Sequence, residues 1–230
     1  MSENNEKIKV IARIRTDLPT KFGIPRQSGL VNALKAIIVF EPEYRNPDAL
    51  RGLEEFSHIW LIWEFSKAVR NTWSPTVRPP RLGGNTRMGV FATRSPFRPN
   101  ALGLSSVKLD GVELHSELGP ILHVSGADLM DDTPIYDIKP YLPYTDSHPQ
   151  AVAGFAEPLR DYVLEVDFSE QWLCLIPQER REALLGVLAH DPRPSYQNDP
   201  KRIYGLEFAG FDIRFTVQGN VLSVCEVVPL

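Results

Sequence analysis

The sequence predicts a mainly β protein in which a small antiparallel barrel or sandwich is followed by a smaller α+β unit, and not a doubly wound parallel sheet. Two observations support this fold class. Six or seven segments before residue 150 have the apolar pattern of strands, and only one short stretch there resembles a helix. Residues 140–158 then contain four prolines, which favour extended, irregular chain between two units.

The first unit is expected over residues 1–148. Residues 7–14 alternate between apolar and polar or basic side chains, which is the period of a half-buried strand. Five further strands are expected at 34–41, 57–65, 88–93, 105–114 and 121–129. Asp110-Gly111 is expected to form a turn within one of them, and the helical stretch runs from Pro47 to Glu55.

The second unit is expected over residues 149–230. It should begin with a strand at 162–168 and continue with a helix from Pro177 to Ala189, which has proline near its first position and ends before Asp191-Pro192. Three strands near 203–208, 211–217 and 221–228 should close the fold, with Gly219-Asn220 as a turn.

Length and composition exclude several classes of protein. With 230 residues, 43% of them hydrophobic and 23% charged, the chain can bury a sizeable core and is not disordered. A net charge of −4 excludes a uniformly basic nucleic-acid-binding protein. No run of eighteen apolar residues and no signal-peptide pattern is present, so we expect a cytoplasmic protein that does not enter a membrane.

The sulfur and imidazole side chains give no metal-site pattern. Cys174 and Cys225 lie in apolar, strand-like surroundings without a Cys-x-x-Cys spacing, and we expect both to be buried and reduced. The five histidines are scattered, with no pair at helical ligand spacing. The sequence therefore predicts no structural or catalytic metal.

Charge is distributed unevenly along the chain. The 45 residues between Glu64 and Asp110 contain eight basic residues and no acidic one, so this segment carries +8 and the remaining 185 residues carry −12. Such a segment can be a solvated loop whose arginines pair with acids elsewhere. Its arginines are interleaved with Trp73, Phe91 and Phe97 and with turn-forming residues, a combination that suits phosphates and unstacked bases. We therefore favour an anionic ligand.

Four segments contain side chains suited to binding or catalysis. In residues 22–29, glycine and proline let the backbone approach a ligand, and Arg26 and Gln27 supply donors, although such a loop is also an ordinary turn. His58 can be a ligand contact or a satisfied strand histidine. Residues 91–105 form a stiff cationic loop that can clamp a carboxylate or simply connect strands. Residues 126–141 contain four carboxylates, which can orient a ribose, accept a proton or cap a turn.

Five segments, in this order along the chain, resemble the TrmO (TsaA-like, formerly YaeB) family of tRNA methyltransferases. They are PRQSGL, GLEEFSHIWLIWEF, RPPRLGGNTRMGVFATRSPFRPN, DLMDDTPIYDIKPYLPYTDS and LAHDPRPSYQNDPKRIYG, the last of which resembles the small C-terminal domain of bacterial members. The resemblance implies an S-adenosylmethionine-dependent, homodimeric enzyme with a small, non-Rossmann β-barrel. It also implies methylation of the exocyclic amine of N6-threonylcarbamoyladenosine, at position 37 beside the tRNA anticodon.

Matched motif by motif, the resemblance implies a set of cofactor-binding positions. They are Pro25, Arg26, Gln27, His58, Ile59, Arg94, Leu104, Asp128, Leu129, Met130 and Asp131. The chain departs from the family motif at Ala101-Leu102, where Pro-Ile is common, and at Asp132, where glycine is common. Arg26 or Arg94 suits the cofactor carboxylate, and Asp128 or Asp131 suits its ammonium or ribose hydroxyls.

Catalysis and tRNA binding are assigned as hypotheses. A carboxylate of the stretch from Asp128 to Asp137, with Asp131 as the candidate, or Tyr136 is expected to accept a hydrogen bond from the attacking amine, because acceptors are concentrated there. The acid-free segment predicts that tRNA phosphates are contacted by Arg70, Arg78, Arg81, Arg87 and Arg98. In the C-terminal unit, the polar side chains around the Asp-Pro-Arg-Pro turn either extend the RNA surface or face solvent; they are Arg193, Lys201, Arg202 and Tyr204.

Two other functions remain open at this point. One is a protein that binds S-adenosylmethionine and tRNA without catalysis, and the other is a methyltransferase that acts on another RNA or on a small molecule.

Overall fold

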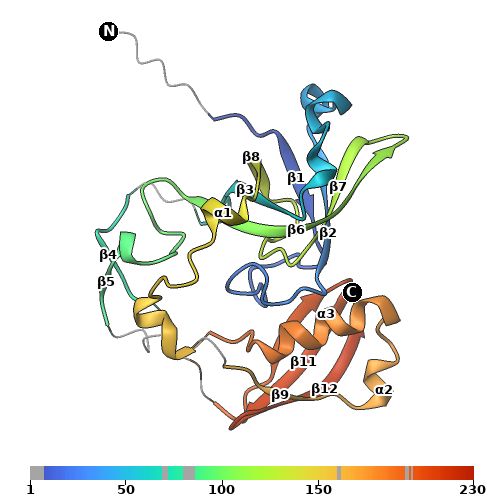
Figure 1. Cartoon of the computed structure of the whole chain (residues 1–230). Helices are drawn as coiled ribbons and strands as arrows, with labels where there is room; N and C mark the ends of the chain where they lie inside the picture. The colour runs from blue at the N-terminus through green and yellow to red at the C-terminus, as the bar shows by residue number, and fades with distance from the viewer. Residues whose placement is uncertain (1–7, 69–71, 80–85, 160–161, 195–196, 198) are drawn as a thin grey trace.

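The computed structural model describes residues 8–68, 72–79, 86–159, 162–194, 197 and 199–230. Its N-terminal part is a six-stranded antiparallel sheet that closes into a barrel (Figure 1). In barrel order the strands are β1 (Ala12–Arg15), β2 (Lys35–Phe40), β7 (Gly119–Ser125), β6 (Leu102–His115), β3 (His58–Glu64) and β8 (Pro134–Pro140). The ring closes through a short β1–β8 ladder. The predicted mainly β, antiparallel fold is confirmed.

Alternation along the strands builds the barrel core. In β3 the side chains of Ile59, Leu61 and Trp63 are buried, whereas the residues between them face outward. Gly103 of β6 pairs with Trp63, and a Cβ atom on Gly103 would lie 2.2 Å from the indole ring, so only glycine fits there. The indole therefore packs directly against the neighbouring strand.

Several local expectations for the first unit are wrong. The Asp110-Gly111 pair is not a turn, because β6 continues to His115 and Asp110 is the extra residue of a bulge, where its carboxylate accepts a hydrogen bond from Lys35 Nζ at 2.9 Å. The strand expected at 88–93 is reduced to β5 (Met88–Gly89), which pairs with β4 (Thr76–Val77) and continues as the 3₁₀ turn Val90–Ala92. β8 was not predicted, because its residues were interpreted as an acidic loop.

The short helical segments also differ from the expectation. The stretch predicted as one helix divides into the 3₁₀ turns Pro47–Leu50 and Leu53–Glu55, preceded by Pro42–Tyr44. The proline-rich linker is not wholly irregular, because it contains α1 (Pro143–Asp146) and the 3₁₀ segment Gly154–Leu159.

The C-terminal layer consists of a four-stranded sheet and two helices. The strands, in the order β10 (Tyr204–Phe208), β11 (Phe211–Gln218), β12 (Val221–Pro229) and β9 (Glu165–Asp167), are accompanied by α2 (Glu170–Leu173) and α3 (Gln178–Ala189). α3 lies across the sheet (Figure 1). The predicted α3 and the three predicted closing strands are confirmed, and each of their ends lies within one residue of the prediction. α2 was not predicted.

The long loop between β1 and β2, residues 16–34, joins the two parts. Its side chains Leu18, Val31 and Leu34 are buried in the core of the C-terminal layer, not in the barrel, and Figure 1 shows the loop between the barrel and α3. The boundary predicted between residues 148 and 149 stays a prediction. The 16–34 loop precedes that boundary in the sequence, yet its apolar side chains belong to the core of the C-terminal layer.

The prediction that both cysteines are buried is wrong. Cys174 and Cys225 are exposed, free thiols. In β12, Leu222 and Val224 point into the core, so the alternation of the strand places Cys225 on the outer face, opposite the register shift between Arg214 and Phe215. The described residues contain no cluster of His, Cys, Asp and Glu suited to a metal ion. Among them, no helix has the length and apolar character needed to cross a membrane.

Candidate functional site

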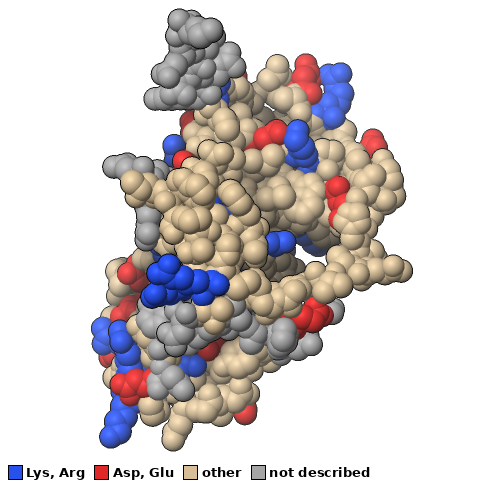
Figure 2. Space-filling model, turned by 90° about the vertical axis from the view of Figure 1, so that its left-hand side faces the viewer, with Lys and Arg blue, Asp and Glu red and all other residues tan. Residues whose placement is uncertain are grey.

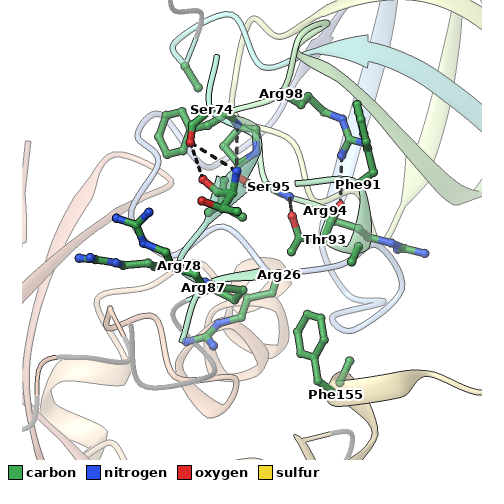
Figure 3. A pocket seen from close by; sticks show the side chains of 18 of the residues that line it. Arg26, Ser74, Arg78, Arg87, Phe91, Thr93, Arg94, Ser95, Arg98 and Phe155 are labelled. Atoms are coloured by element: carbon green, nitrogen blue, oxygen red, sulfur yellow. Dashed lines mark hydrogen bonds between the residues drawn. The ribbon is translucent and has the colours of Figure 1, made fainter. Parts of the chain in front are cut away.

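A pocket of about 1410 Å³ lies where the barrel loops meet the C-terminal layer (Figure 3). Its walls come from residues of the β1–β2 loop, the segments 72–79 and 87–98, the linker at 153–156 and the corner Pro192–Pro194. Its described lining residues include seven basic side chains and no Asp or Glu; the basic ones are Lys21, Arg26, Arg78, Arg87, Arg94, Arg98 and Arg193. The pocket is therefore strongly electropositive.

The β4–β5 hairpin places two of these arginines side by side. Val77 pairs with Met88, so Arg78 and Arg87 occupy the next opposite positions, and Figure 3 shows them together on one side of the pocket. Like charges at opposite positions repel each other. An anion bound beside them would relieve that repulsion.

Four of the pocket arginines have no carboxylate within ion-pair distance among the described residues. Within the described part of the chain, Arg78, Arg87, Arg94 and Arg98 form no ion pair. The solvated-loop alternative, in which these arginines pair with acids elsewhere, is therefore not supported for these four. Figure 2 shows basic side chains near the junction of the two parts of the molecule. Arg70 and Arg81 lie outside the described residues.

Flat apolar rings accompany the charges. Trp73 and Phe91 are 55% and 72% exposed, and their ring centroids are 6.3 Å apart. Phe97 and Phe155 also line the pocket, Phe155 from the linker (Figure 3). Exposed aromatic rings next to arginines can stack on unpaired bases.

Three of the predicted cofactor-binding residues, Arg26, Gln27 and Arg94, line the pocket, and a fourth, Asp128, interacts with Arg94 without lining it. Arg94 donates a hydrogen bond to Gln27 Oε1, and the charge of Arg94 acts on the carboxylate of Asp128. Asp128 also accepts hydrogen bonds from the backbone N–H of Ser28 and from Ser105 Oγ, the latter at 2.6 Å. Burial raises the pKa of Asp128, and these donors and the arginine oppose that shift in part.

A buried relay fixes the Asp128 carboxylate from behind. Trp63 Nε1 donates to Ser105 Oγ at 3.0 Å, and that hydroxyl donates in turn to Asp128 Oδ1. Trp63 and Ser105 are 5% and 1% exposed. Sequence reasoning did not select Ser105; a hydroxyl at an inward position of an otherwise apolar strand was the available signal.

Other predicted cofactor residues do not line this pocket. Ile59 and Leu129 are fully buried in the barrel core, and Pro25 is buried beside Arg26. His58 and Leu104 lie on the outer face of β3 and β6; the His58 ring is 6.1 Å from Tyr141, and Leu104 is 59% exposed.

The acidic loop before β8 faces β1. Asp131 Oδ1 accepts the backbone N–H of Thr16 at 3.0 Å, and the carbonyl of Met130 accepts a hydrogen bond from Thr133. Asp132 has φ of 61°, a left-handed conformation that explains why glycine suits this position. Its carboxylate contacts Arg13 and Arg15 at 3.3 and 2.9 Å, which compensates for the backbone strain.

Tyr136 lies on β8 beside a carboxylate that sequence reasoning missed. Its hydroxyl donates to Glu64 Oε2 at 2.7 Å. Burial, together with this hydrogen bond, raises the pKa of Tyr136 to about 12. The phenol therefore stays protonated at neutral pH.

The corner after α3 is buried and not solvent-facing. Arg193 is 7% exposed and its guanidinium forms a fork with Asp191, with N···O distances of 2.8 and 3.0 Å. Tyr204 is also buried, at 4%. For these two residues the solvent-facing alternative is wrong, and the RNA alternative stays a prediction, whereas Lys201 and Arg202 are exposed.

The fold and the pocket together define a class of protein: a non-Rossmann β-barrel that presents a cationic, aromatic-lined cavity to an anionic ligand. Models of one family match both parts of the chain, "tRNA-methyltransferase O N-terminal domain" over residues 13–147 and "TrmO C-terminal domain" over residues 161–230. The chain belongs to the TrmO family.

Relatives and solved structures agree with this assignment. The chain is 43% identical over 227 residues to the Escherichia coli (strain K12) "tRNA (adenine(37)-N6)-methyltransferase", covering 95% of this chain and 96% of that protein. It is 39% identical over 216 residues to the Pseudomonas aeruginosa "Putative S-adenosylmethionine-dependent methyltransferase RcsF", covering 90% and 91%. The crystal structure of TrmO from Pseudomonas aeruginosa superposes with a TM-score of 0.78 at 33% identity, covering 97% and 99%.

The relay predicts a pH-dependent effect of Ser105→Ala. Without the hydroxyl, Asp128 loses a donor to its ionised form, so its pKa rises further. When the pKa of a carboxyl is higher in the folded than in the unfolded state, the free energy of unfolding falls as pH rises from the unfolded to the folded pKa. The variant should therefore lose about 1–3 kcal/mol of unfolding free energy at pH 7, and less at pH 4, in urea titrations.

Ser106→Ala, on the partly exposed side of the same strand, is the matched control and should change little at either pH. An equal loss at both pH values for Ser105→Ala would show that the hydroxyl does not act on the Asp128 carboxylate.

Proposed function

We propose that this chain is an S-adenosylmethionine-dependent methyltransferase that methylates N6 of adenosine 37 in tRNA, with N6-threonylcarbamoyladenosine as the acceptor. Family membership supports the activity. The observation that carries it to this molecule is the pocket, in which Arg78, Arg87 and Arg98, which form no ion pair among the described residues, and exposed aromatic rings lie beside Gln27 and Arg94.

The residues present fit the proposed cofactor. Arg94 and Arg26 supply guanidinium groups for its carboxylate, and Asp128 supplies a buried carboxylate for its ammonium. The remaining implied positions are Pro25, Gln27, His58, Ile59, Leu104, Leu129, Met130 and Asp131. Pockets for one small molecule usually have about 300–1,000 Å³, so the observed volume leaves room for a nucleoside beside the cofactor.

S-adenosylmethionine, when bound, supplies a methyl group that its sulfonium already activates. The protein therefore contributes mainly by holding the adenine amine in line with that methyl group. We propose that Tyr136 or Asp131 accepts a hydrogen bond from the amine as its proton leaves. In the Tyr136 route, the phenol oxygen takes the amine proton while its own proton passes to the Glu64 carboxylate, to which it already donates a hydrogen bond. In the Asp131 route, the carboxylate takes the amine proton itself.

The anionic partner is the tRNA anticodon loop. Single-stranded loops are recognised by splaying bases onto aromatic rings while arginines contact phosphates. Trp73 and Phe91 are exposed and lie next to each other, so a splayed base can stack on either ring. Three arginines, Arg78, Arg87 and Arg98, line the same cavity. Arg70 and Arg81 belong to the same acid-free segment.

A homodimer would explain why two implied cofactor positions, His58 and Leu104, and the implied proton acceptor Tyr136 lie away from the pocket. His58, Leu104 and Tyr136 share the outer face of neighbouring strands β6, β3 and β8, and the exposed Leu104 side chain gives that face apolar area. A second copy packed on that face would place these three side chains next to the pocket of that second copy.

Light scattering measures the mass of the protein in solution directly. A monomer at micromolar concentration would exclude this assembly. We propose a cytoplasmic location, which a tRNA substrate supports.

The function is tested with purified full-length chain, labelled S-adenosylmethionine and tRNA with or without the threonylcarbamoyl group. The proposal expects label only in the threonylcarbamoylated tRNA, at N6 of adenosine 37. Label in neither tRNA would refute methyl transfer to this substrate, and label in both would show that the threonylcarbamoyl group is not recognised.

The double variant Arg78→Gln, Arg87→Gln should weaken tRNA binding and flatten its salt dependence. Loss of two phosphate contacts lowers the slope of log K against log salt by about 1.5. Affinity for S-adenosylmethionine, measured by calorimetry, should not change. The matched control is Lys9→Gln, Arg51→Gln, which removes two exposed barrel charges outside the pocket. A loss of cofactor affinity in the arginine variant would instead place these residues at the cofactor.

Tyr136→Phe or Asp131→Asn should lower the single-turnover methylation rate with saturating tRNA by about a hundredfold, the usual contribution of a proton acceptor. Asp137→Asn is the control, because Asp137 lies on the same strand and pairs with Lys139. If both variants kept the wild-type rate, neither residue would be the acceptor.

A further inference from the structure

The loop that carries Arg26 and Gln27 is part of the C-terminal core. Leu18, Val31 and Leu34 are 1%, 4% and 4% exposed, and all three pack among side chains of the C-terminal layer. Gly186 of α3 makes room for this contact, because a Cβ atom there would lie 2.6 Å from Val31 Cγ1. The loop conformation therefore depends on the C-terminal layer.

Polar contacts hold the same loop at both of its ends. At its start, the backbone N–H of Ala209 donates to the carbonyl of Asp17 at 3.0 Å, and the Asp17 carboxylate pairs with Arg180 of α3. Near its end, His190 Nε2 lies 3.1 Å from the carbonyl oxygen of Leu30, to which it can donate. These contacts come from two places in the C-terminal layer, the β10–β11 turn and α3 with its C-terminal cap.

The corner after α3 reaches Arg26 itself. Asp191 has φ of 52° and forms the fork with Arg193, which fixes the backbone of the corner. The carbonyl oxygen of Arg193 accepts a hydrogen bond from Arg26 Nη2 at 3.3 Å. Because Arg193 is buried and its charge is paired with Asp191, its side chain is not available as a free phosphate contact.

We propose that the C-terminal layer acts on the cofactor-binding loop, and that Asp191 and Arg193 are positioning residues for Arg26. The inference rests on the proposed function, because it takes Arg26 as a ligand of S-adenosylmethionine. In this view, the C-terminal layer holds in place the wall of the pocket that carries Arg26 and Gln27. Weakening the Asp191–Arg193 corner therefore affects cofactor affinity before it affects tRNA affinity.

The test uses Asp191→Asn in the full chain. Asparagine tolerates the left-handed backbone at this position but lacks the charge of the fork. Calorimetry with S-adenosylmethionine should show a dissociation constant about tenfold higher, because a hydrogen bond from a charged donor becomes poorly placed. Filter binding with threonylcarbamoylated tRNA should give the wild-type dissociation constant, and KM for the cofactor should rise more than kcat falls.

The chain offers a matched control in Asp212→Asn. Asp212 and Arg214 form a second Asp-x-Arg pair in the same layer, with Arg214 Nε 2.9 Å from Asp212 Oδ2, but neither residue lines the pocket. This variant should keep wild-type cofactor affinity. If Asp191→Asn does not fold, as judged by its melting temperature, Arg193→Lys tests the same fork while keeping a positive charge at the position.

The outcomes separate the inference from the function beneath it. Unchanged cofactor affinity in a folded corner variant would overturn the inference, and a selective loss of tRNA affinity would overturn it in favour of an RNA-binding corner. A wild-type chain that bound no S-adenosylmethionine would refute the proposed function, and the inference with it.

Discussion

The packing of the β1–β2 loop between two hydrophobic cores is the constraint on which the rest of the site depends. The loop leaves the barrel after Arg15, buries Leu18, Val31 and Leu34 in the C-terminal layer, and returns to the barrel at Lys35. Burying apolar side chains of this size contributes about 1.5–3 kcal/mol each. A loop held in this way keeps Arg26 and Gln27 at the pocket without a helix or strand of its own.

Positive and negative charge are segregated in this chain. The +8 segment supplies the arginine wall, and the acidic remainder of the chain carries −12. A protein with this distribution is repelled by polyanions over most of its surface and attracts them at one cavity. The net charge of −4 therefore does not argue against an RNA partner, because the positive charge is concentrated where the aromatic rings are exposed.

Much of the fold could be predicted, because strand periodicity is local. The β3 and β11 patterns, for example, specify both the strand and its buried face. β8 was not predicted because its outward-facing residues include Asp137 and Lys139, which form an ion pair. With the aspartates before it, these charged residues gave the segment the composition of an acidic loop. Asp110 forms a bulge and not a turn because Lys35 and Ser125, distant in sequence, bind its carboxylate.

The site could be predicted in part. Arg26, Gln27, Arg94 and the acid-free segment were identified from motifs and charge, and the structure brings them together. Phe155 and Arg193 join the pocket only through the packing of the C-terminal layer, which no local pattern encodes. Ser105 and Glu64 were missed because the role of each comes from a hydrogen bond with one residue that is distant in the sequence. Ser105 bonds to Asp128, and Glu64 bonds to Tyr136.

A structure of the full chain with S-adenosylhomocysteine and a threonylcarbamoylated anticodon stem-loop would show directly whether this pocket receives the tRNA. We expect adenosine 37 to be flipped into the cavity lined by Arg26, Arg94 and Phe155, with the loop phosphates along Arg78 and Arg87. A stem-loop bound on the opposite side of the barrel, with this cavity unoccupied by nucleotide, would contradict it.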